Sequence, residues 1–126
     1  MTDWSKYANF TEAEFVCHCG CGRADMKEPF LARLQWARDV YCHPIVVTSG
    51  YRCPEYDEAI GGAGVHPTGH AADIAVSGED SFNMLFAALH VDMRGIGLKQ
   101  HGPWDGRFMH LDDLSGPTRP RSWTYK

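Results

Sequence analysis

The spacing of apolar side chains predicts a long helix in the first third of the chain. Pro29 suits a first helical position, and apolar residues then follow three or four positions apart until His43-Pro44 ends the pattern. These apolar residues are Phe30, Leu31, Leu34, Ala37, Val40 and Tyr41. We therefore expect a helix over residues 29–41, preceded by a single helical turn at the capping sequence Thr11-Glu12-Ala13-Glu14.

A second stretch has the polar start and the periodicity of an amphipathic helix. It begins at Ser77-Gly78-Glu79-Asp80, where Asp80 is a weaker match than glutamate or glutamine at the fourth position of a capping box. Its large apolar side chains, at helical spacing, are Phe82, Leu85, Phe86 and Leu89. We interpret this apolar face as core and expect it to be buried.

Short apolar runs predict strands in the rest of the chain. The runs are Ile45–Thr48, Ala72–Val76, Gly95–Leu98 and Phe108–Leu111. A short helix is expected over residues 54–60, closed by Gly61-Gly62. Because helices come early and strands cluster later without regular alternation, we expect an α+β fold, with a small, mostly antiparallel sheet flanked by helices. The length of 126 residues, without repeats or linkers, fits one domain over residues 1–126.

Charge and hydropathy argue against nucleic-acid and membrane functions. The net charge is −4, and lysine and arginine never form a run longer than two, so we expect no nucleic-acid partner and no polybasic membrane surface. No apolar stretch has the length of a membrane span, and the first residues lack the apolar region of a secretory signal. We expect a monomer that is synthesised in the cytoplasm and reaches any extracellular target by another route.

The five cysteines allow more than one interpretation. Cys17-x-Cys19-x-Cys21 is spaced too tightly for the usual zinc-finger pair. Together with His18, Cys42 and Cys53, these residues offer a structural metal site or a disulfide if they cluster in space. Synthesis in a reducing cytosol favours the other interpretation, which is buried free thiols.

Two histidines and an aspartate are candidate ligands of a catalytic metal. His66 and Asp73 are seven residues apart, and Pro67-Thr68-Gly69 between them supplies a chain reversal that brings a loop residue and a strand residue together. Asp73 opens an apolar strand, where a carboxylate without a partner would be costly to bury. His110 stands in another apolar strand and offers a third donor. Two imidazoles and one carboxylate leave one zinc coordination position for water, which is the pattern of a catalytic site.

Six motifs in fixed order give the chain a resemblance to a known family. They are Ser49-Gly50-Tyr51-Arg52, Gly61-Gly62-Ala63, His66-x-x-Gly69-x-Ala71-x-Asp73, Gly95-Ile96-Gly97, Phe108-Met109-His110-Leu111-Asp112 and Arg121-Ser122-Trp123. This set resembles the zinc D-alanyl-D-alanine carboxypeptidase family, in particular its short members from phages and prophages, which belong with the lysostaphin and hedgehog-type metallopeptidases. The resemblance extends from about Phe10 to Trp123.

The resemblance implies a hedgehog/DD-peptidase-like fold and a function. His66, Asp73 and His110 would bind one Zn²⁺, and Arg52, next to Tyr51, would hold a carboxylate of the substrate. A rigid guanidinium fork suits that role, although a surface ion pair is the alternative for Arg52. The implied reaction is hydrolysis of a peptide bond in a peptidoglycan stem peptide.

The general base is the part of the family pattern that this sequence lacks. Relatives often carry an acid three residues before the last histidine ligand, where this chain has Arg107. Asp105 is the first candidate and His101 the second, since both lie in the loop that enters the last strand; His101 is also a candidate for stabilising the oxyanion. Asp112 is a third candidate, but it fits better as a group that orients a metal ligand.

Three further positions, Gly64, His70 and Asp57, differ from the residues usual in relatives. These differences make the substrate harder to infer from the resemblance, but none of them removes a metal ligand. We expect a phage or prophage wall peptidase, acting after release or as a virion component. Endopeptidase and carboxypeptidase activities both fit. The alternative is a catalytically inactive zinc-containing binding module of the same fold, which the absence of an acid at position 107 favours.

Overall fold

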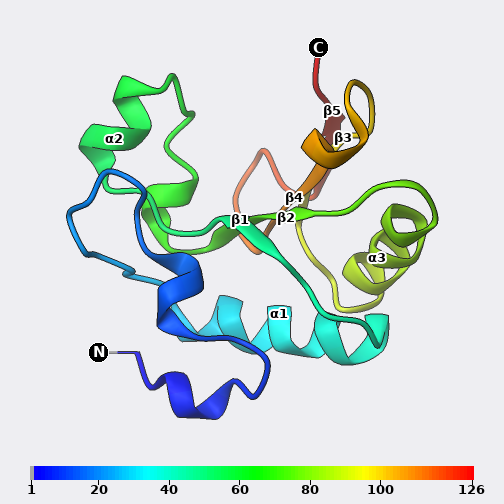
Figure 1. Ribbon diagram of the computed structural model, residues 1–126, viewed down its shortest axis with the longest axis horizontal. Helices are drawn as coiled ribbons and strands as arrows, with labels where there is room; N and C mark the ends of the chain where they lie inside the picture. Colours follow the sequence, from blue (N-terminus) through cyan, green and yellow to red (C-terminus); the bar gives the residue numbers. More distant parts are fainter. Residues whose placement is uncertain (1) are drawn as a thin grey trace.

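The computed structural model describes residues 2–126 and consists of a five-stranded sheet with helices around it (Figure 1). The strands are β1 (Val47–Ser49), β2 (Ala71–Ala75), β3 (Gly95–Lys99), β4 (Phe108–Asp112) and β5 (Arg121–Thr124). Their order in the sheet is β1-β2-β4-β3-β5. Every pair is antiparallel except β3 with β5, which is parallel. The expected α+β class with a mostly antiparallel sheet is confirmed.

The helices begin and end close to the positions that the sequence predicts. They are α1 (Glu28–Tyr41), α2 (Pro54–Ala59) and α3 (Gly78–His90), with 3₁₀ turns η1 (Trp4–Lys6), η2 (Glu12–Phe15), η3 (His66–Thr68) and η4 (Trp104–Gly106). The capping box at Thr11 forms, and its backbone N–H donates to the Glu14 carboxylate over 2.6 Å. None of the helices within residues 2–126 is long and apolar enough to span a membrane.

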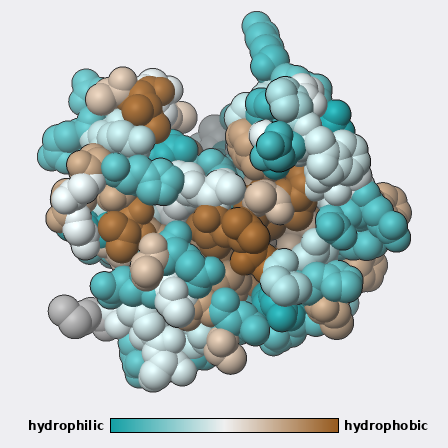
Figure 2. Space-filling model, viewed as in Figure 1, coloured by the Kyte–Doolittle hydropathy of each residue, from teal (hydrophilic) through white to brown (hydrophobic). Residues whose placement is uncertain are grey.

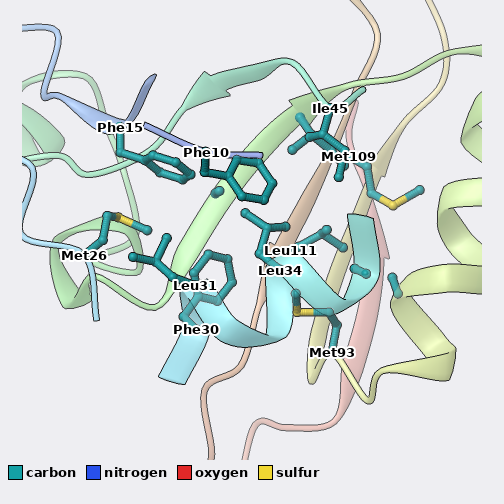
Figure 3. Close-up of a cluster of buried hydrophobic side chains, with 14 of the residues drawn as sticks. Phe10, Phe15, Met26, Phe30, Leu31, Leu34, Ile45, Met93, Met109 and Leu111 are labelled. Carbon is teal, nitrogen blue, oxygen red and sulfur yellow. The ribbon is translucent and has the colours of Figure 1, made fainter. Parts of the chain in front are cut away.

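Alternation along the strands separates a core face of the sheet from a polar one. Ile74 of β2 and Met109 and Leu111 of β4 are fully buried in the core. Figure 3 shows Leu111 beside Leu34 of α1, and Met109 beside Ile45. Successive side chains of a strand point to opposite faces of the sheet. Asp73 is next to Ile74, and His110 lies between Met109 and Leu111, so both candidate ligands point away from the core.

The predicted burial of the apolar face of α3 is wrong. Phe82, Phe86 and Leu89 are 74%, 62% and 63% exposed, and only Leu85 is partly buried. The residues that α3 buries are instead Ser81, Met84, Ala87 and Ala88. They share one side of the helix at the same three- and four-residue spacing, and three of them, Ser81, Ala87 and Ala88, are small enough to let α3 approach α1. Periodicity alone does not distinguish between two such faces.

Candidate metal centre and cavity

Strand register brings Asp73 and His110 together. The two residues are direct partners across β2 and β4, on the face of the sheet opposite the core. Nδ1 of His110 lies 3.0 Å from Oδ1 of Asp73. The convergence of residues that are 37 positions apart is therefore a property of the antiparallel pairing.

His66 reaches the same point from the turn that precedes β2. It begins η3, and Gly69 ends this turn with a φ of 77°, a conformation that glycine adopts without strain. Nε2 of His66 lies 3.4 Å from Oδ1 of Asp73. One donor atom from each of His66, Asp73 and His110 lies within 4.8 Å of the others, so the structure brings together the three ligands predicted from the sequence.

Each imidazole uses one nitrogen as an anchor and presents the other to the centre. Nδ1 of His66 donates to the carbonyl oxygen of Gly50 over 2.8 Å, which leaves Nε2 with a lone pair. Nε2 of His110 lies 2.8 Å from Oδ2 of Asp112, and donation to this carboxylate leaves Nδ1 free. Both tautomers are those of a metal-bound histidine whose other nitrogen is hydrogen-bonded.

Asp112 is held by Arg119, a residue that the sequence analysis did not single out. Nε and Nη2 of Arg119 each lie 2.9 Å from one oxygen of the fully buried Asp112 carboxylate. Burial alone would raise the pKa of Asp112, but hydrogen bonds from His110 and Arg119 outweigh it and lower the pKa to about 2. An ionised Asp112 can only accept, which fixes the proton of His110 on Nε2.

The centre is electrostatically prepared for a positive charge. Burial would raise the pKa of Asp73, but hydrogen bonds from His110 and His66, when these imidazoles carry both protons, hold that pKa well below its usual range. Burial would lower the pKa of His110, but the carboxylates of Asp112 and Asp73 raise it instead. Two imidazole lone pairs and a carboxylate oxygen that face one another in this field fit a divalent metal ion that prefers nitrogen and oxygen donors, as zinc does.

The three donors open into a cavity of about 600 Å³ on the polar side of the sheet. Its walls come from the α2–η3 segment on one side and from the chain after β4 on the other, and Figure 2 shows the surface hollowed between these two parts. The lining residues outside the metal centre include Arg52, Gly62, Phe108, Arg119, Arg121, Trp123 and Tyr125. Three of them are arginines, so the cavity suits a substrate that carries a carboxylate.

Arg52 lies at this cavity with most of its guanidinium already held. Its Nε donates to the Ser49 hydroxyl over 3.1 Å and its Nη1 to Asp57 over 3.0 Å. Nη2 has only a longer contact, 3.5 Å from Oδ2 of Asp73. Its side chain is 17% exposed and that of Asp57 is 4% exposed, so Arg52 forms a largely buried ion pair beside the candidate metal centre.

Tyr51 lies differently from its neighbour. It is 3% exposed and belongs to the hydrophobic core, with the guanidinium of Arg23 over its ring at 5.4 Å. It is absent from the described residues that line the cavity. Tyr51 therefore contacts the core and Arg23, and it is the residue before Arg52 in the chain.

The two candidate bases are both exposed, and neither is among the described residues that line the cavity. Asp105 lies in η4, beside Trp104, which packs on Gly78 at the start of α3. Nε2 of His101 lies 3.0 Å from the carbonyl oxygen of Tyr125, whose ring lines the cavity. Of the two candidate bases, His101 is the one with a hydrogen bond to a residue that lines the cavity.

The C-terminal wall contains further residues that the sequence analysis did not identify as site residues. Trp123 of β5 packs on His110 of β4 with a ring separation of 5.2 Å. Gly97 of β3, the strand between them, has no side chain and so leaves room for the indole of Trp123. Tyr125 lies against Phe108 at 5.1 Å. The signal that could have pointed to a partner such as Arg119 is the carboxylate of Asp112 in an apolar strand, which needs a cation if it is buried.

The chain matches a known protein family over most of its length. The model of a family described as Peptidase M15 matches residues 8–112, a range that contains the three candidate ligands, Arg52 and Asp112. Arg119, Trp123 and Tyr125 lie after the matched range. No curated protein matches the chain.

Proposed function

Because the chain belongs to the M15 peptidase family, the zinc D-alanyl-D-alanine carboxypeptidases, we propose that it hydrolyses a D-amino-acid-containing peptide bond in peptidoglycan stem peptides. The family predicted from the motifs is confirmed, and zinc metallopeptidase is the enzyme class that follows from it. The bond, the reaction type and the biological setting are our proposals.

The observation that carries the proposal is the convergence of His66, Asp73 and His110 at one wall of the cavity. The three residues would hold a single Zn²⁺. When bound, this ion supplies a Lewis acid that lowers the pKa of a coordinated water and polarises the substrate carbonyl. The protein contributes fixed donor atoms, because Gly50 and Asp112 anchor the outer nitrogens of the two imidazoles.

Arg52 is proposed to bind a carboxylate of the substrate. Ser49 and Asp57 fix two of its nitrogens, so the direction of Nη2 is set before substrate arrives. A preorganised guanidinium loses little conformational entropy on binding and recognises a planar carboxylate well. Its position next to Asp73 would place that carboxylate within reach of the reacting bond.

The proton that leaves the attacking water needs an acceptor, and we retain Asp105 and His101 as the candidates. The contact of His101 with the Tyr125 backbone favours His101. General-base catalysis needs hydrogen-bond reach, directly or through one water, so either residue would have to approach when substrate is bound. Tyr51 supports the binding of substrate through the backbone that it shares with Arg52.

We further propose that the protein is a phage or prophage wall endopeptidase, acting as a lysin or a virion component. This rests on the resemblance of its motifs to the short phage members of the family. Endopeptidase and carboxypeptidase activities differ in their products, since the first creates new amino termini within the stem peptide and the second releases free D-alanine.

The test is digestion of purified peptidoglycan by the zinc-loaded protein, followed by mass spectrometry of the muropeptides. We expect a defined product that disappears with a chelator, returns with zinc and is absent for His110→Ala. If the zinc-loaded protein gives neither new amino termini nor free D-alanine, the proposed reaction is wrong.

The second candidate function is a zinc-containing module that binds peptidoglycan without cutting it. The exposed positions of Asp105 and His101, outside the cavity lining, favour this alternative. It predicts sedimentation with insoluble peptidoglycan and bound zinc, with no product from any stem peptide. Binding that survives the double replacement of both residues, in a protein without activity, would support it.

A further inference from the structure

Four of the five cysteines converge at a place separate from the cavity. One sulfur atom from each of Cys17, Cys19, Cys21 and Cys53 lies within 4.8 Å of the others. The Sγ atoms of Cys17 and Cys19 are 3.5 Å apart, and those of Cys19 and Cys53 are 3.6 Å apart. All five cysteines are free, and Cys42 stays outside the group, with its thiol donating to the Asp39 carbonyl.

Two of the sulfur–sulfur distances are close to the edge length of a tetrahedral metal–thiolate site. A disulfide bond is about 2.0 Å long, so these pairs are far from bonded. Zinc–thiolate bonds of about 2.3 Å in tetrahedral geometry place neighbouring sulfurs about 3.8 Å apart. The observed separations of 3.5 and 3.6 Å are close to this edge length.

A backbone donor points at one of the four sulfur atoms. The N–H of Cys53 donates to Sγ of Cys17 over 3.3 Å. Gly20, with a φ of 91°, lies in the turn that brings the sulfur atoms of Cys19 and Cys21 close to those of Cys17 and Cys53. Backbone N–H donors stabilise the charged form of a group that accepts from them.

We infer that Cys17, Cys19, Cys21 and Cys53 bind a second divalent metal, a structural zinc held by four thiolates. Soft sulfur donors in a tetrahedral set select zinc among the common divalent ions. Four protein donors leave no coordination position for water, so this ion would have no part in hydrolysis.

The second zinc would join the cysteine loop to the beginning of α2. Cys53 is the residue before α2 and follows Arg52 directly, whereas the other three ligands lie in the loop after η2; Figure 1 shows this blue loop beside the start of α2. The same loop carries Arg23, which covers the ring of Tyr51. The ion would therefore fix the segment that presents Arg52 to the cavity, and would supply folding free energy directly.

Metal counting on the whole chain tests the inference. We expect two zinc ions per chain for the wild type, one for Cys19→Ser, one for the double variant His66→Ala/His110→Ala, and two for the matched control Cys42→Ser. A thiol reagent such as p-chloromercuribenzoate should release one zinc from the wild type and from the histidine double variant. It should release none from Cys19→Ser.

The histidine double variant also decides the matter if Cys19→Ser fails to fold. Loaded with cobalt, it should show sulfur-to-cobalt charge-transfer absorption and the intense visible bands of a tetrahedral thiolate site. A folded double variant without these bands, or peptide mapping that finds disulfides among the four cysteines of the purified protein, would overturn the inference. Both readouts are independent of peptidase activity, so the failure of the proposed reaction leaves this result unaffected.

Discussion

The guanidinium of Arg119 donates two hydrogen bonds, each 2.9 Å long, to the carboxylate of Asp112. Asp112 also accepts a hydrogen bond from His110. Arg119 is thus connected to the candidate metal ligand His110 through Asp112. Asp112 is fully buried, and the Arg119 side chain is 7% exposed. Ion pairs so well shielded from water are sensitive to the loss of one partner, since the other is left buried with its charge.

Arg119→Ala should weaken both zinc binding and the fold. Removing one partner of a buried pair costs about 3–5 kcal/mol of the free energy of unfolding. Loss of a group that orients a metal ligand costs about 10- to 100-fold in metal affinity. Competition with a chromogenic chelator and chemical denaturation of the same protein measure the two effects.

Arg121→Ala is the matched control, because Arg121 also lines the cavity and lies over Trp123 but forms no ion pair with a carboxylate of residues 2–126. It should change zinc affinity and stability little. Equal losses for both variants would mean that general cavity charge, and not the contact with Asp112, accounts for the effect.

The stability difference between wild type and Arg119→Ala should also depend on pH. The pKa of Asp112 is lowered to about 2, below its value of about 3.9 in an unfolded chain, so its ionisation stabilises the fold above pH 4. This contribution is lost as the pH falls from about 4 to 2, and the variant should converge toward the wild type there. Denaturation midpoints of both proteins, measured across this pH range, check the prediction. A stability difference that stays constant with pH would contradict the role given to the ionised Asp112.

Arg52→Ala should raise KM more than it lowers kcat. Loss of a charge-assisted contact to a substrate carboxylate is worth about 1.5–3 kcal/mol, or roughly 10- to 100-fold in binding. The variant should keep its zinc, because Arg52 is not a ligand. Steady-state kinetics with a defined stem peptide measure the split, and Arg94→Ala, which removes a surface partner of Asp92, serves as control.

His101→Gln and Asp105→Asn distinguish the two candidate bases. A general base contributes about 10²- to 10⁴-fold to the rate, so we expect a loss of that size in kcat for His101→Gln and little change for Asp105→Asn. Bound zinc, measured in each variant, shows that the metal centre is intact. The reverse pattern would assign the role to Asp105, and full activity in the double variant would remove both from the mechanism.

Gly62→Ala should disturb Arg52 without touching the metal centre. A Cβ at Gly62 would collide with the carboxylate of Asp57, which accepts from Arg52 and from the backbone N–H of Gly64. Overpacking of this kind costs about 1–3 kcal/mol. We expect a lower melting temperature and a raised KM.

Gly106→Ala provides the comparison for this change, because no described atom would lie within 4 Å of the added Cβ and its φ is ordinary. It should leave the melting temperature and KM nearly unchanged. A stable Gly62→Ala protein with normal KM would show that Asp57 moves freely and does not position Arg52.

The sequence predicted the parts of this molecule that local patterns determine. The helix over 29–41 could be found because its apolar spacing, its proline and its stop signal agree, and α1 forms there. The turn sequence between His66 and Asp73 indicated that these two residues meet. The choice of His66 and His110 as metal ligands needed the resemblance, since an isolated histidine is more often a core residue than a ligand.

The parts that the sequence did not predict depend on contacts between distant segments. Two faces of α3 have helical spacing, and only the close approach of α1 selects the one with small residues. Arg119 meets Asp112 because the chain after β4 turns back over the sheet, and no local pattern marks that return. β5 pairs in parallel with β3, which also requires knowledge of the assembled sheet.

The position of β5 has a practical consequence for work on this protein. Its pairing with β3 makes Trp123 and Tyr125 part of the cavity wall. A peptide inserted directly after Tyr125 would start where substrate is expected, whereas one inserted next to η1 would start at an element that is absent from the described residues lining the cavity. Changes in this tail would also offer a route to altered substrate preference that leaves every metal donor in place.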